Sequence, residues 1–283
     1  MSSRAKILIF DSGVGGLSVA DEIVKKRPHA DIIYAADSEF LPYGMRADAE
    51  LKARVPALLQ ALEDRYRPDL VVIACNTAST IALPETRALL TTPVVGAVPA
   101  IKPAASLSQN RVIGFLGTPR TVEREYSDAL IRDFANGCTV IRFGSSTLVD
   151  LAERKLAGEP IAYSAVAGAL APMFAKPDAD RMDVAVLACT HFPLLRAEVE
   201  AASPPGLTWI DSGEAVARRV LSVLGQECGA GEPRPVAVFT TAPGKLRPAA
   251  PAFIERGFPG FEDWDSLLMG KGAVERLRAE RRA

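Results

Sequence analysis

Short runs of apolar, mostly β-branched residues alternate with longer amphipathic stretches along most of this chain. The apolar runs have the length of strands and span residues 6–11, 31–37, 70–76, 93–99, 111–118, 139–144, 184–190, 207–211 and 236–241. The stretches between them show helical spacing, for example at residues 17–26, 47–65, 122–134 and 161–174. Strands that alternate with helices predict βαβ units and mainly parallel sheets, and wholly apolar runs are typical of strands buried on both faces. The pattern therefore predicts an α/β fold.

Two parts of the chain repeat one pattern. Residues 70–78 and 184–192 each read as a buried strand, then a cysteine at its carboxyl end, then small polar residues that open a helix. An earlier strand precedes each of them, at residues 7–13 and 112–118. We interpret this as an internal duplication that gives two pseudo-symmetric α/β domains. Ligands of open parallel sheets bind at the carboxyl ends of the strands, so we expect the active site in the cleft between the domains.

The length of 283 residues agrees with about two domains. Proline-rich turns near residues 99–103 and 203–206 mark the two crossings between them. These turns predict a discontinuous first domain of residues 1–98 plus 211–283 and a second domain of residues 99–210.

Composition narrows the class of protein without identifying it. The net charge of −1 gives no broad attraction for nucleic acid or an anionic membrane, and the basic residues within 271–282 alternate with acidic ones, as on a solvated helix face. No apolar run reaches the roughly 18 residues of a membrane helix, and the first strand begins by Ile7, too early for a signal peptide. Four cysteines without a Cys-x-x-Cys pair predict no disulfide framework, so we expect a reducing, cytoplasmic location.

Two of the four cysteines lie where chemistry is expected. A lone cysteine in an apolar run is more often a buried, inert side chain. Cys75 and Cys189, however, both follow a predicted parallel strand and precede a predicted helix start, where the helix dipole lowers the pKa of a thiol. Cys138 and Cys228 lack this setting, so we interpret them as structural or incidental.

A pair of thiols suits one kind of reaction in particular. Inversion of a carbon centre removes a proton from one face and returns a proton to the other, and a single group cannot reach both faces of a held substrate. One thiolate and one thiol on opposite walls meet this need in either direction. Backbone N–H groups at helix starts can hold a substrate carboxylate while charge develops. Such a site needs no cofactor, and no local motif marks a Schiff-base lysine.

The glycine-rich segment of residues 11–16 follows the first strand and allows two interpretations. It approaches the Gly-x-Gly-x-x-Gly pattern of dinucleotide-binding loops, with Asp37 placed as a ribose-binding acid, but Ser18 stands where the last glycine belongs. A tight turn that holds a carboxylate or phosphate is simpler. Asp11 is placed to bind an ammonium group or to assist a nearby thiol, or alternatively to cap the next helix.

Further polar residues accompany the two cysteines. His191 lies two residues after Cys189 and is a candidate for tuning a proton transfer. Small polar residues follow each cysteine and offer hydrogen bonds to a small polar substrate: Asn76, Thr77 and Thr190. The segment Pro42-Tyr43-Gly44 reads as a turn.

Together these motifs resemble the glutamate racemases. The resemblance rests on four segments in order, Phe10-Asp-Ser-Gly-Val-Gly-Gly-Leu-Ser18, Pro42-Tyr-Gly44, Ala74-Cys-Asn-Thr-Ala78 and Cys189-Thr-His-Phe-Pro-Leu-Leu195. The segments Val98-Pro-Ala-Ile-Lys-Pro-Ala104 and Leu151-Ala-Glu-Arg-Lys-Leu-Ala-Gly158 fit one branch of that family, and the similarity spans residues 7–225.

The resemblance implies a cofactor-independent enzyme that interconverts L- and D-glutamate, supplies D-glutamate for peptidoglycan and forms a homodimer. It also implies that Cys75 acts on D-glutamate and Cys189 on L-glutamate, and that Asp11, His191 and Glu153 assist them. The positions that it implies for substrate contact are Asp11, Ser12, Pro42, Tyr43, Gly44, Asn76, Thr77, Thr190 and His191, with Thr118 and Thr121 on the side-chain carboxylate. It implies no metal.

The chain departs from the family pattern at two points. Ala188 stands where the family usually has glycine before the second cysteine, and the N-terminal extension of some members is absent. We therefore expect no control by a cell-wall precursor of the kind that such an extension supports.

Four alternatives stay open. The nearest is an aspartate-type racemase with the same two thiols, although the segment 189–195 favours glutamate. The others are a cysteine hydrolase that uses Cys189, His191 and Asn76, a zinc site that adds Cys75 and Asp11 to Cys189 and His191, and a non-catalytic protein that binds acidic amino acids.

Overall fold

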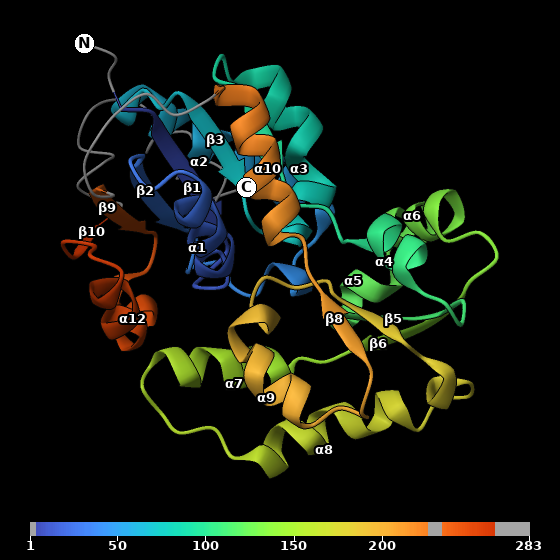
Figure 1. The fold of residues 1–283 in the computed structure, drawn as a ribbon. Helices are drawn as coiled ribbons and strands as arrows, with labels where there is room; N and C mark the ends of the chain where they lie inside the picture. The colour runs from blue at the N-terminus through green and yellow to red at the C-terminus, as the bar shows by residue number, and fades with distance from the viewer. Residues whose placement is uncertain (1–3, 226–233, 264–283) are drawn as a thin grey trace.

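The computed structural model describes residues 4–225 and 234–263. The chain forms two parallel sheets, each covered by helices on both faces (Figure 1). The predicted α/β class is therefore confirmed. The basic residues within 271–282 and Cys228 lie outside the described residues.

The first sheet has six parallel strands and combines both ends of the described chain. In spatial order they are β10 (Phe261–Asp263), β9 (Arg234–Thr240), β2 (Asp31–Ala36), β1 (Lys6–Asp11), β3 (Leu70–Ile73) and β4 (Val94–Gly96). The helices that accompany it are α1 (Leu17–Lys26), α2 (Asp48–Tyr66), α3 (Asn76–Leu89), α10 (Gly213–Leu224), α11 (Pro243–Leu246) and α12 (Ala250–Glu255). Two short 3₁₀ helices complete this half, η1 (Tyr43–Met45) and η4 (Arg247–Ala249).

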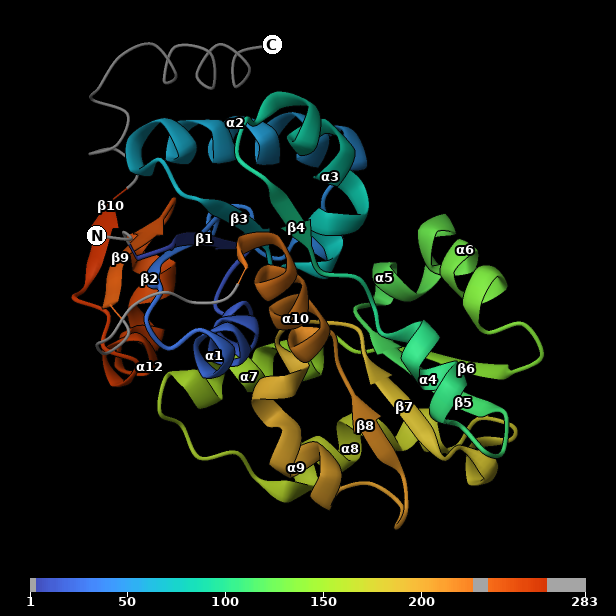
Figure 2. The same ribbon diagram turned by 45° about the horizontal axis from the view of Figure 1, so that its top comes forward.

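Alternation of side chains along the central strands builds two cores around this sheet. Ile7 and Ile9 of β1 pack toward α1, α10 and α12, whereas Leu8 and Phe10 pack toward α2 and α3 (Figure 2). All four side chains are buried. A strand that is apolar on both faces can lie only in the middle of such a three-layer arrangement.

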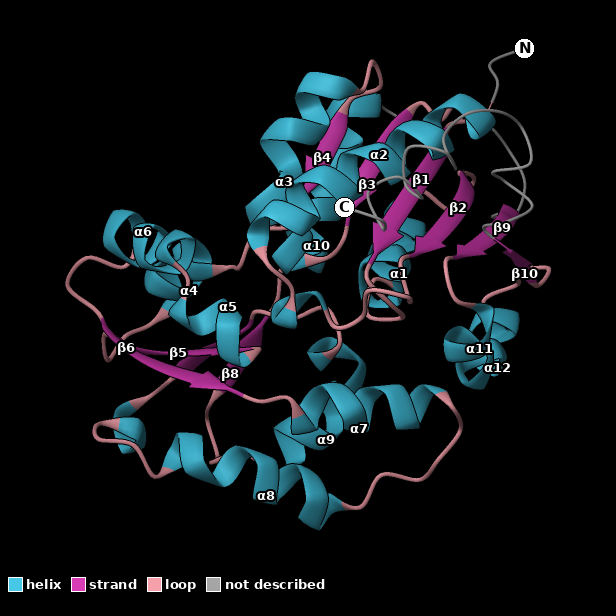
Figure 3. Cartoon of the chain, turned by 180° about the vertical axis from the view of Figure 1, so that it is seen from behind, coloured by secondary structure: helices cyan, strands magenta, loops and turns pink. Residues whose placement is uncertain are grey.

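The second sheet has four parallel strands, in the spatial order β6 (Thr139–Gly144), β5 (Val112–Gly117), β7 (Val184–Leu187) and β8 (Thr208–Ile210). Its helices are α4 (Ile101–Leu107), α5 (Pro119–Glu123), α6 (Glu125–Phe134), α7 (Thr147–Leu156), α8 (Tyr163–Phe174) and α9 (Arg196–Ala201), with the 3₁₀ helices η2 (Ala179–Arg181) and η3 (Phe192–Leu195). Seen from behind, β1 and β2 point toward this half of the molecule (Figure 3). The proposed domain limits near residues 98 and 211 stay a prediction.

Each predicted strand run contains a strand, and the predicted helices at 17–26, 47–65 and 161–174 are present within two residues of their limits. The helix predicted for residues 122–134 is present as α6 over Glu125–Phe134, but its predicted start is wrong, because Arg124 adopts an extended conformation that separates α5 from α6. Its guanidinium group pairs with Asp48 across the molecule, and the Ser127 hydroxyl donates to the Thr121 carbonyl beneath the break. Strand β10 was not predicted, because it is short and carries two acidic residues.

Within residues 4–225 and 234–263, no helix is both long enough and apolar enough to cross a membrane.

Candidate active site

The carboxyl ends of four central strands meet around one small cavity. Ser12 follows β1, and Cys75 follows β3 in the first half; Thr118 follows β5, and Cys189 closely follows β7 in the second. The lining consists of Ser12, Leu41, Pro42, Tyr43, Gly44, Cys75, Asn76, Thr77, Thr118, Thr121, Val149, Ala188, Cys189, Thr190 and His191. Its volume of about 30 Å³ exceeds by only a small factor the roughly 10–15 Å³ that one water molecule needs. The two halves therefore leave little free space between them at the site.

Cys75 occupies the N-terminal cap position of α3 and is buried. Its thiol donates a hydrogen bond to Ser12 Oγ over 3.7 Å. Burial, together with the nearby charge of Asp11, raises the pKa of the Cys75 thiol to about 12, and hydrogen bonds with the Ala78 backbone and Ser12 offset only part of the rise. The expectation of a lowered pKa is wrong for Cys75, because lost hydration outweighs the dipole of α3.

Cys189 has a different local structure. It is followed by a turn and then by the 3₁₀ helix η3, so the predicted α-helix start directly after this cysteine is wrong. Its Sγ lies 3.8 Å from Nδ1 of His191, whose Nε2 lies 2.8 Å from Oε1 of Glu153. Glu153 comes from α7, so two separate segments of the second half form this chain of side chains.

His191 is the cationic member of that chain. Burial alone would lower the pKa of His191, but its hydrogen bonds with Cys189 and Glu153 outweigh burial and hold the pKa well above the ordinary value. A protonated imidazole donates through both nitrogens. His191 can therefore donate to a Cys189 thiolate and to the Glu153 carboxylate at once.

Asp11 ends β1 and is fully buried. One carboxylate oxygen accepts from the Gly13 amide at 2.8 Å, and the other accepts from the Thr190 hydroxyl at 3.1 Å, across the two halves. Burial raises the pKa of Asp11, and the charge of His191 and the two hydrogen bonds reverse only part of that rise. The alternative role as a helix cap is wrong, because no side chain caps α1 at Gly16.

The glycine-rich loop after β1 makes close contact with the second half. A Cβ at Gly15 would lie 2.4 Å from Thr190 Oγ1 and 2.6 Å from Nδ1 of His191. Only glycine permits this approach, so packing against the Cys189 segment accounts for the glycine. The dinucleotide interpretation also loses its ribose-binding acid, because the Asp37 carboxylate is buried and hydrogen-bonded to Arg54, Tyr43 and Thr241.

Asn76 and the threonines supply the remaining polar lining. Asn76 Oδ1 is buried without a hydrogen-bond partner within the described residues. Thr118 Oγ1 and Thr121 Oγ1 lie 2.7 Å apart and share a hydrogen bond. Residues 43–45 form η1 rather than an isolated turn, and a Cβ at Gly44 would lie 2.9 Å from Thr118 Oγ1.

Two chemical alternatives find no geometric support. In a cysteine hydrolase an amide would orient the histidine, but His191 Nε2 bonds to Glu153 while Asn76 Oδ1 has no partner in the described structure. No group of three or more His, Cys, Asp or Glu side chains in residues 4–225 and 234–263 has the arrangement of a metal site.

All fourteen sequence-predicted residues line the cavity or contact one of its lining residues directly. Asp11 and Glu153 lie behind the lining rather than in it. The lining residues Leu41 and Val149 were not predicted. They are apolar and carry no motif, so only the fold identifies them.

Comparison with known proteins agrees with this geometry. The profile of the Asp/Glu/Hydantoin racemase family matches residues 11–220. The glutamate racemase of Sphingopyxis alaskensis is 52% identical over 237 residues, which cover 83% of this chain and 88% of that protein. The glutamate racemase of Vibrio campbellii is 52% identical over 223 residues, covering 79% and 81%.

A solved structure shares the fold. The crystal structure of Escherichia coli glutamate racemase, in complex with L-glutamate and the activator UDP-MurNAc-ala, aligns with a TM-score of 0.85 and 42% identity. The alignment covers 92% of this chain and 98% of that one. The chain therefore belongs to the Asp/Glu/Hydantoin racemase family and, within it, to the glutamate racemases.

Proposed function

We propose that this chain interconverts L-glutamate and D-glutamate by proton transfer between two cysteines at the α-carbon, and that it supplies D-glutamate for peptidoglycan. The observation that carries the proposal is that Cys75 and Cys189, one from each half of the molecule, line the same small cavity. Names of relatives at about half identity support the substrate.

The surroundings of the two thiols suggest how a turnover begins. With its pKa raised to about 12, Cys75 is a thiol at neutral pH, whereas the Cys189 sulfur faces the cationic His191. A Cys189 thiolate takes the α-proton of L-glutamate, and the Cys75 thiol gives its proton to the other face of the carbanion. The products are D-glutamate, a Cys75 thiolate and a Cys189 thiol, from which the reverse reaction runs.

Two features of the cavity suit the polar groups of the substrate. The unpartnered Oδ1 of Asn76 is an acceptor that an α-ammonium group would satisfy, and leaving such a buried acceptor unpaired costs about 1–3 kcal/mol. The first N–H groups of α3, beside Cys75, lack intrahelical acceptors and favour an anion such as the α-carboxylate. The hydroxyl pair of Thr118 and Thr121 would hold the side-chain carboxylate.

The small cavity volume implies that the two halves separate to admit glutamate. Contacts between the halves would then break and re-form in each turnover. The contacts in question include the hydrogen bond from Thr190 to Asp11 and the hydrogen bond from the Ser18 hydroxyl to the Thr190 carbonyl.

The test follows L-glutamate by circular dichroism in D₂O with purified protein, alongside Cys75→Ser and Cys189→Ser. We expect loss of the optical signal with deuterium entering the α-position, and no loss with either variant. Decay with L-aspartate but not with L-glutamate would keep the mechanism and correct the substrate. No decay with either amino acid would reject the racemase proposal in favour of a binding protein.

A further inference from the structure

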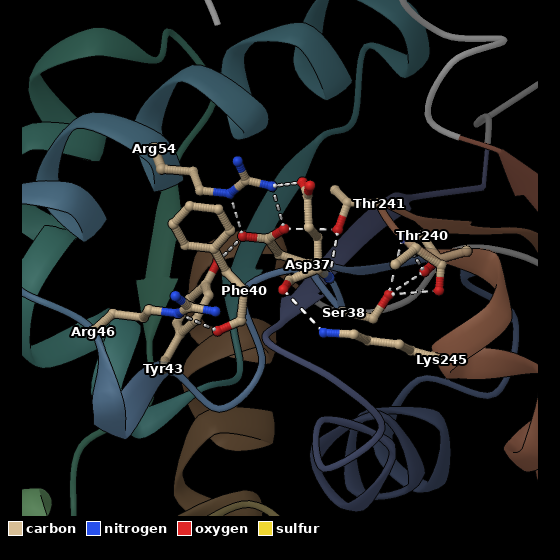
Figure 4. Close-up of polar contacts among 11 residues, drawn as sticks. Asp37, Ser38, Phe40, Tyr43, Arg46, Arg54, Thr240, Thr241 and Lys245 are labelled. Atoms are coloured by element: carbon tan, nitrogen blue, oxygen red, sulfur yellow. Dashed lines mark hydrogen bonds and ion pairs between the residues drawn. The ribbon is translucent and has the colours of Figure 1, made fainter. Parts of the chain in front are cut away.

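A second polar cluster lies directly behind the cavity. Its centre is Asp37, which follows β2 and is fully buried (Figure 4). Asp37 does not line the cavity, and its backbone amide donates to the Asp11 carbonyl at 3.0 Å. The cluster is therefore adjacent to the site without touching the space that the substrate would fill.

The Asp37 carboxylate accepts four short hydrogen bonds. Its Oδ2 accepts from Tyr43 Oη and from Arg54 Nε, each at 2.7 Å. Its Oδ1 accepts from Arg54 Nη2 and from Thr241 Oγ1, also at 2.7 Å each. The two Arg54 bonds are a bidentate pair, and the Arg54 side chain is only 12% exposed. An ionised carboxylate accepts at both oxygens, whereas an amide would turn an N–H group toward one of these donors.

This cluster reaches the cavity through Tyr43. Tyr43 is one of the residues that line the cavity, and its hydroxyl is held on Asp37, as Figure 4 shows. The next residue, Gly44, packs so closely on Thr118 that a Cβ would lie 2.9 Å from Oγ1. A small displacement of Tyr43 would therefore shift residues 42–44, which form the first half's wall of the cavity, against Thr118 of the second half.

Arg54 fixes the other side of the same wall. Its guanidinium group lies over the Phe40 ring at 3.7 Å, and Arg46, directly after η1, lies over that ring at 4.6 Å and donates to the Phe40 carbonyl. The segment 40–46 is thus attached to Arg54 at Phe40, and its other end at Arg46 folds back onto Phe40.

We infer that Asp37 is a positioning residue of the racemase site, which holds Tyr43, and with it the wall at residues 42–44, in the place that a bound glutamate requires. The inference rests on the proposed function. Asp37 acts through Tyr43 and takes no part in proton transfer, because both its oxygens are occupied and neither faces the cavity.

The experiment compares Asp37→Asn, Tyr43→Phe and the control Asp21→Asn. Asp21 accepts a bidentate pair from Arg256 at 2.8 Å on the far side of α1, so the control removes a similar pair away from the cavity. For Asp37→Asn we expect KM for both enantiomers to rise about tenfold with kcat changed less than about threefold, because the wall binds but does not transfer protons. Tyr43→Phe, which keeps the Asp37–Arg54 pair, should show a smaller rise, and Asp21→Asn none.

A binding measurement separates this inference from the function itself. In a Cys75→Ser background without turnover, the Kd of D-glutamate measured by calorimetry should rise with Asp37→Asn and Tyr43→Phe in parallel with KM. A fall in Tm with unchanged KM and Kd in both variants would overturn the inference, because Asp37 would then serve only stability. A large loss of kcat at unchanged KM would overturn it in favour of direct catalysis. If Asp37→Asn does not fold, the KM, Kd and kcat of Tyr43→Phe decide between these outcomes. A wild-type chain that does not racemise glutamate would instead reject the proposed function.

Discussion

The two cysteine segments share a strand-end position but differ in what surrounds the sulfur. Cys75 bonds to Ser12 and lies near Asp11, so its neighbours are neutral or anionic. Cys189 lies beside His191, whose hydrogen bonds with Cys189 and with Glu153 of α7 hold its pKa well above the ordinary value. Two segments that hold a cysteine at the same place in the fold therefore differ in the charges around the sulfur. The side chains that arrive from elsewhere in each half surround two similar thiols with groups of different charge.

Loss of either thiol should have the largest effect on the rate of racemisation. Cys75→Ser and Cys189→Ser should each lower kcat in both directions by at least about 10³-fold, near the upper range for a single acid/base group, because each direction uses both sulfurs. Polarimetry with each enantiomer measures this. A variant that keeps more than a tenth of the wild-type rate would contradict a two-thiol reaction.

Removal of one assisting residue should slow one of the two proton transfers more than the other, so that isotope effects distinguish them. His191→Asn and Asp11→Asn should each lower kcat/KM by about 100-fold, equally for both enantiomers because racemisation has an equilibrium constant of unity. His191→Asn slows the transfers at Cys189. The primary isotope effect with α-deuterated L-glutamate should therefore rise, and that with α-deuterated D-glutamate should fall.

Asp11→Asn should show the opposite pattern, with the larger isotope effect for the D-enantiomer, because Asp11 neighbours Cys75. Equal isotope effects for the two enantiomers in both variants would contradict the assignment of Asp11 to Cys75 and of His191 to Cys189.

Chemical labelling reports the resting difference between the sulfurs. Both cysteines are similarly buried, at 6% and 9% exposure, so access alone does not distinguish them. At neutral pH iodoacetamide should modify Cys189 at least about tenfold faster than Cys75, because a thiolate is the nucleophile and Cys75 is held as a thiol. Peptide mapping by mass spectrometry separates these sites from Cys138. His191→Asn should bring the two rates together, and faster labelling of Cys75 would reverse our assignment.

The smallest predicted effect is that of Asp11→Asn on thermal stability. The raised pKa of Asp11 means that the folded chain binds this proton more tightly than the unfolded chain does. Burying the carboxylate therefore costs nothing below its ordinary pKa of 3.8, and the cost grows as the pH rises toward the folded value. At neutral pH Asp11→Asn should raise Tm by about 2 °C despite the lost activity. Calorimetry near pH 7 and near pH 3 checks the sign, since the gain should vanish at the lower pH.

Sequence patterns predicted the parts of the site that follow a strand end. Asp11, Cys75 and Cys189 come directly after apolar runs, and topology brings strand ends together. Glu153 shows the limit, since only the packing of α7 places its carboxylate on a histidine 38 residues away. The raised pKa of Cys75 was predicted with the wrong sign, because a local helix dipole is readable from sequence whereas burial depends on the whole fold.

The cluster around Asp37 was beyond prediction for a related reason. Its partner Thr241 is 204 residues distant, and Arg54 lies within a helix whose sequence shows only a polar position. Apolar lining residues such as Leu41 and Val149 likewise carry no chemical signature. Pairings of this kind depend on which helix packs against which strand, so they follow from the fold rather than from local pattern.

The small size of the cavity has a consequence for inhibitors. A ligand over which the two halves close again must be small, and small enclosed ligands can reach high affinity per atom. A longer compound would hold the halves apart and would forgo the contact of Gly15 with Thr190 and His191. Potency against this chain should therefore fall abruptly, rather than gradually, once a glutamate analogue is too long for the halves to close over it.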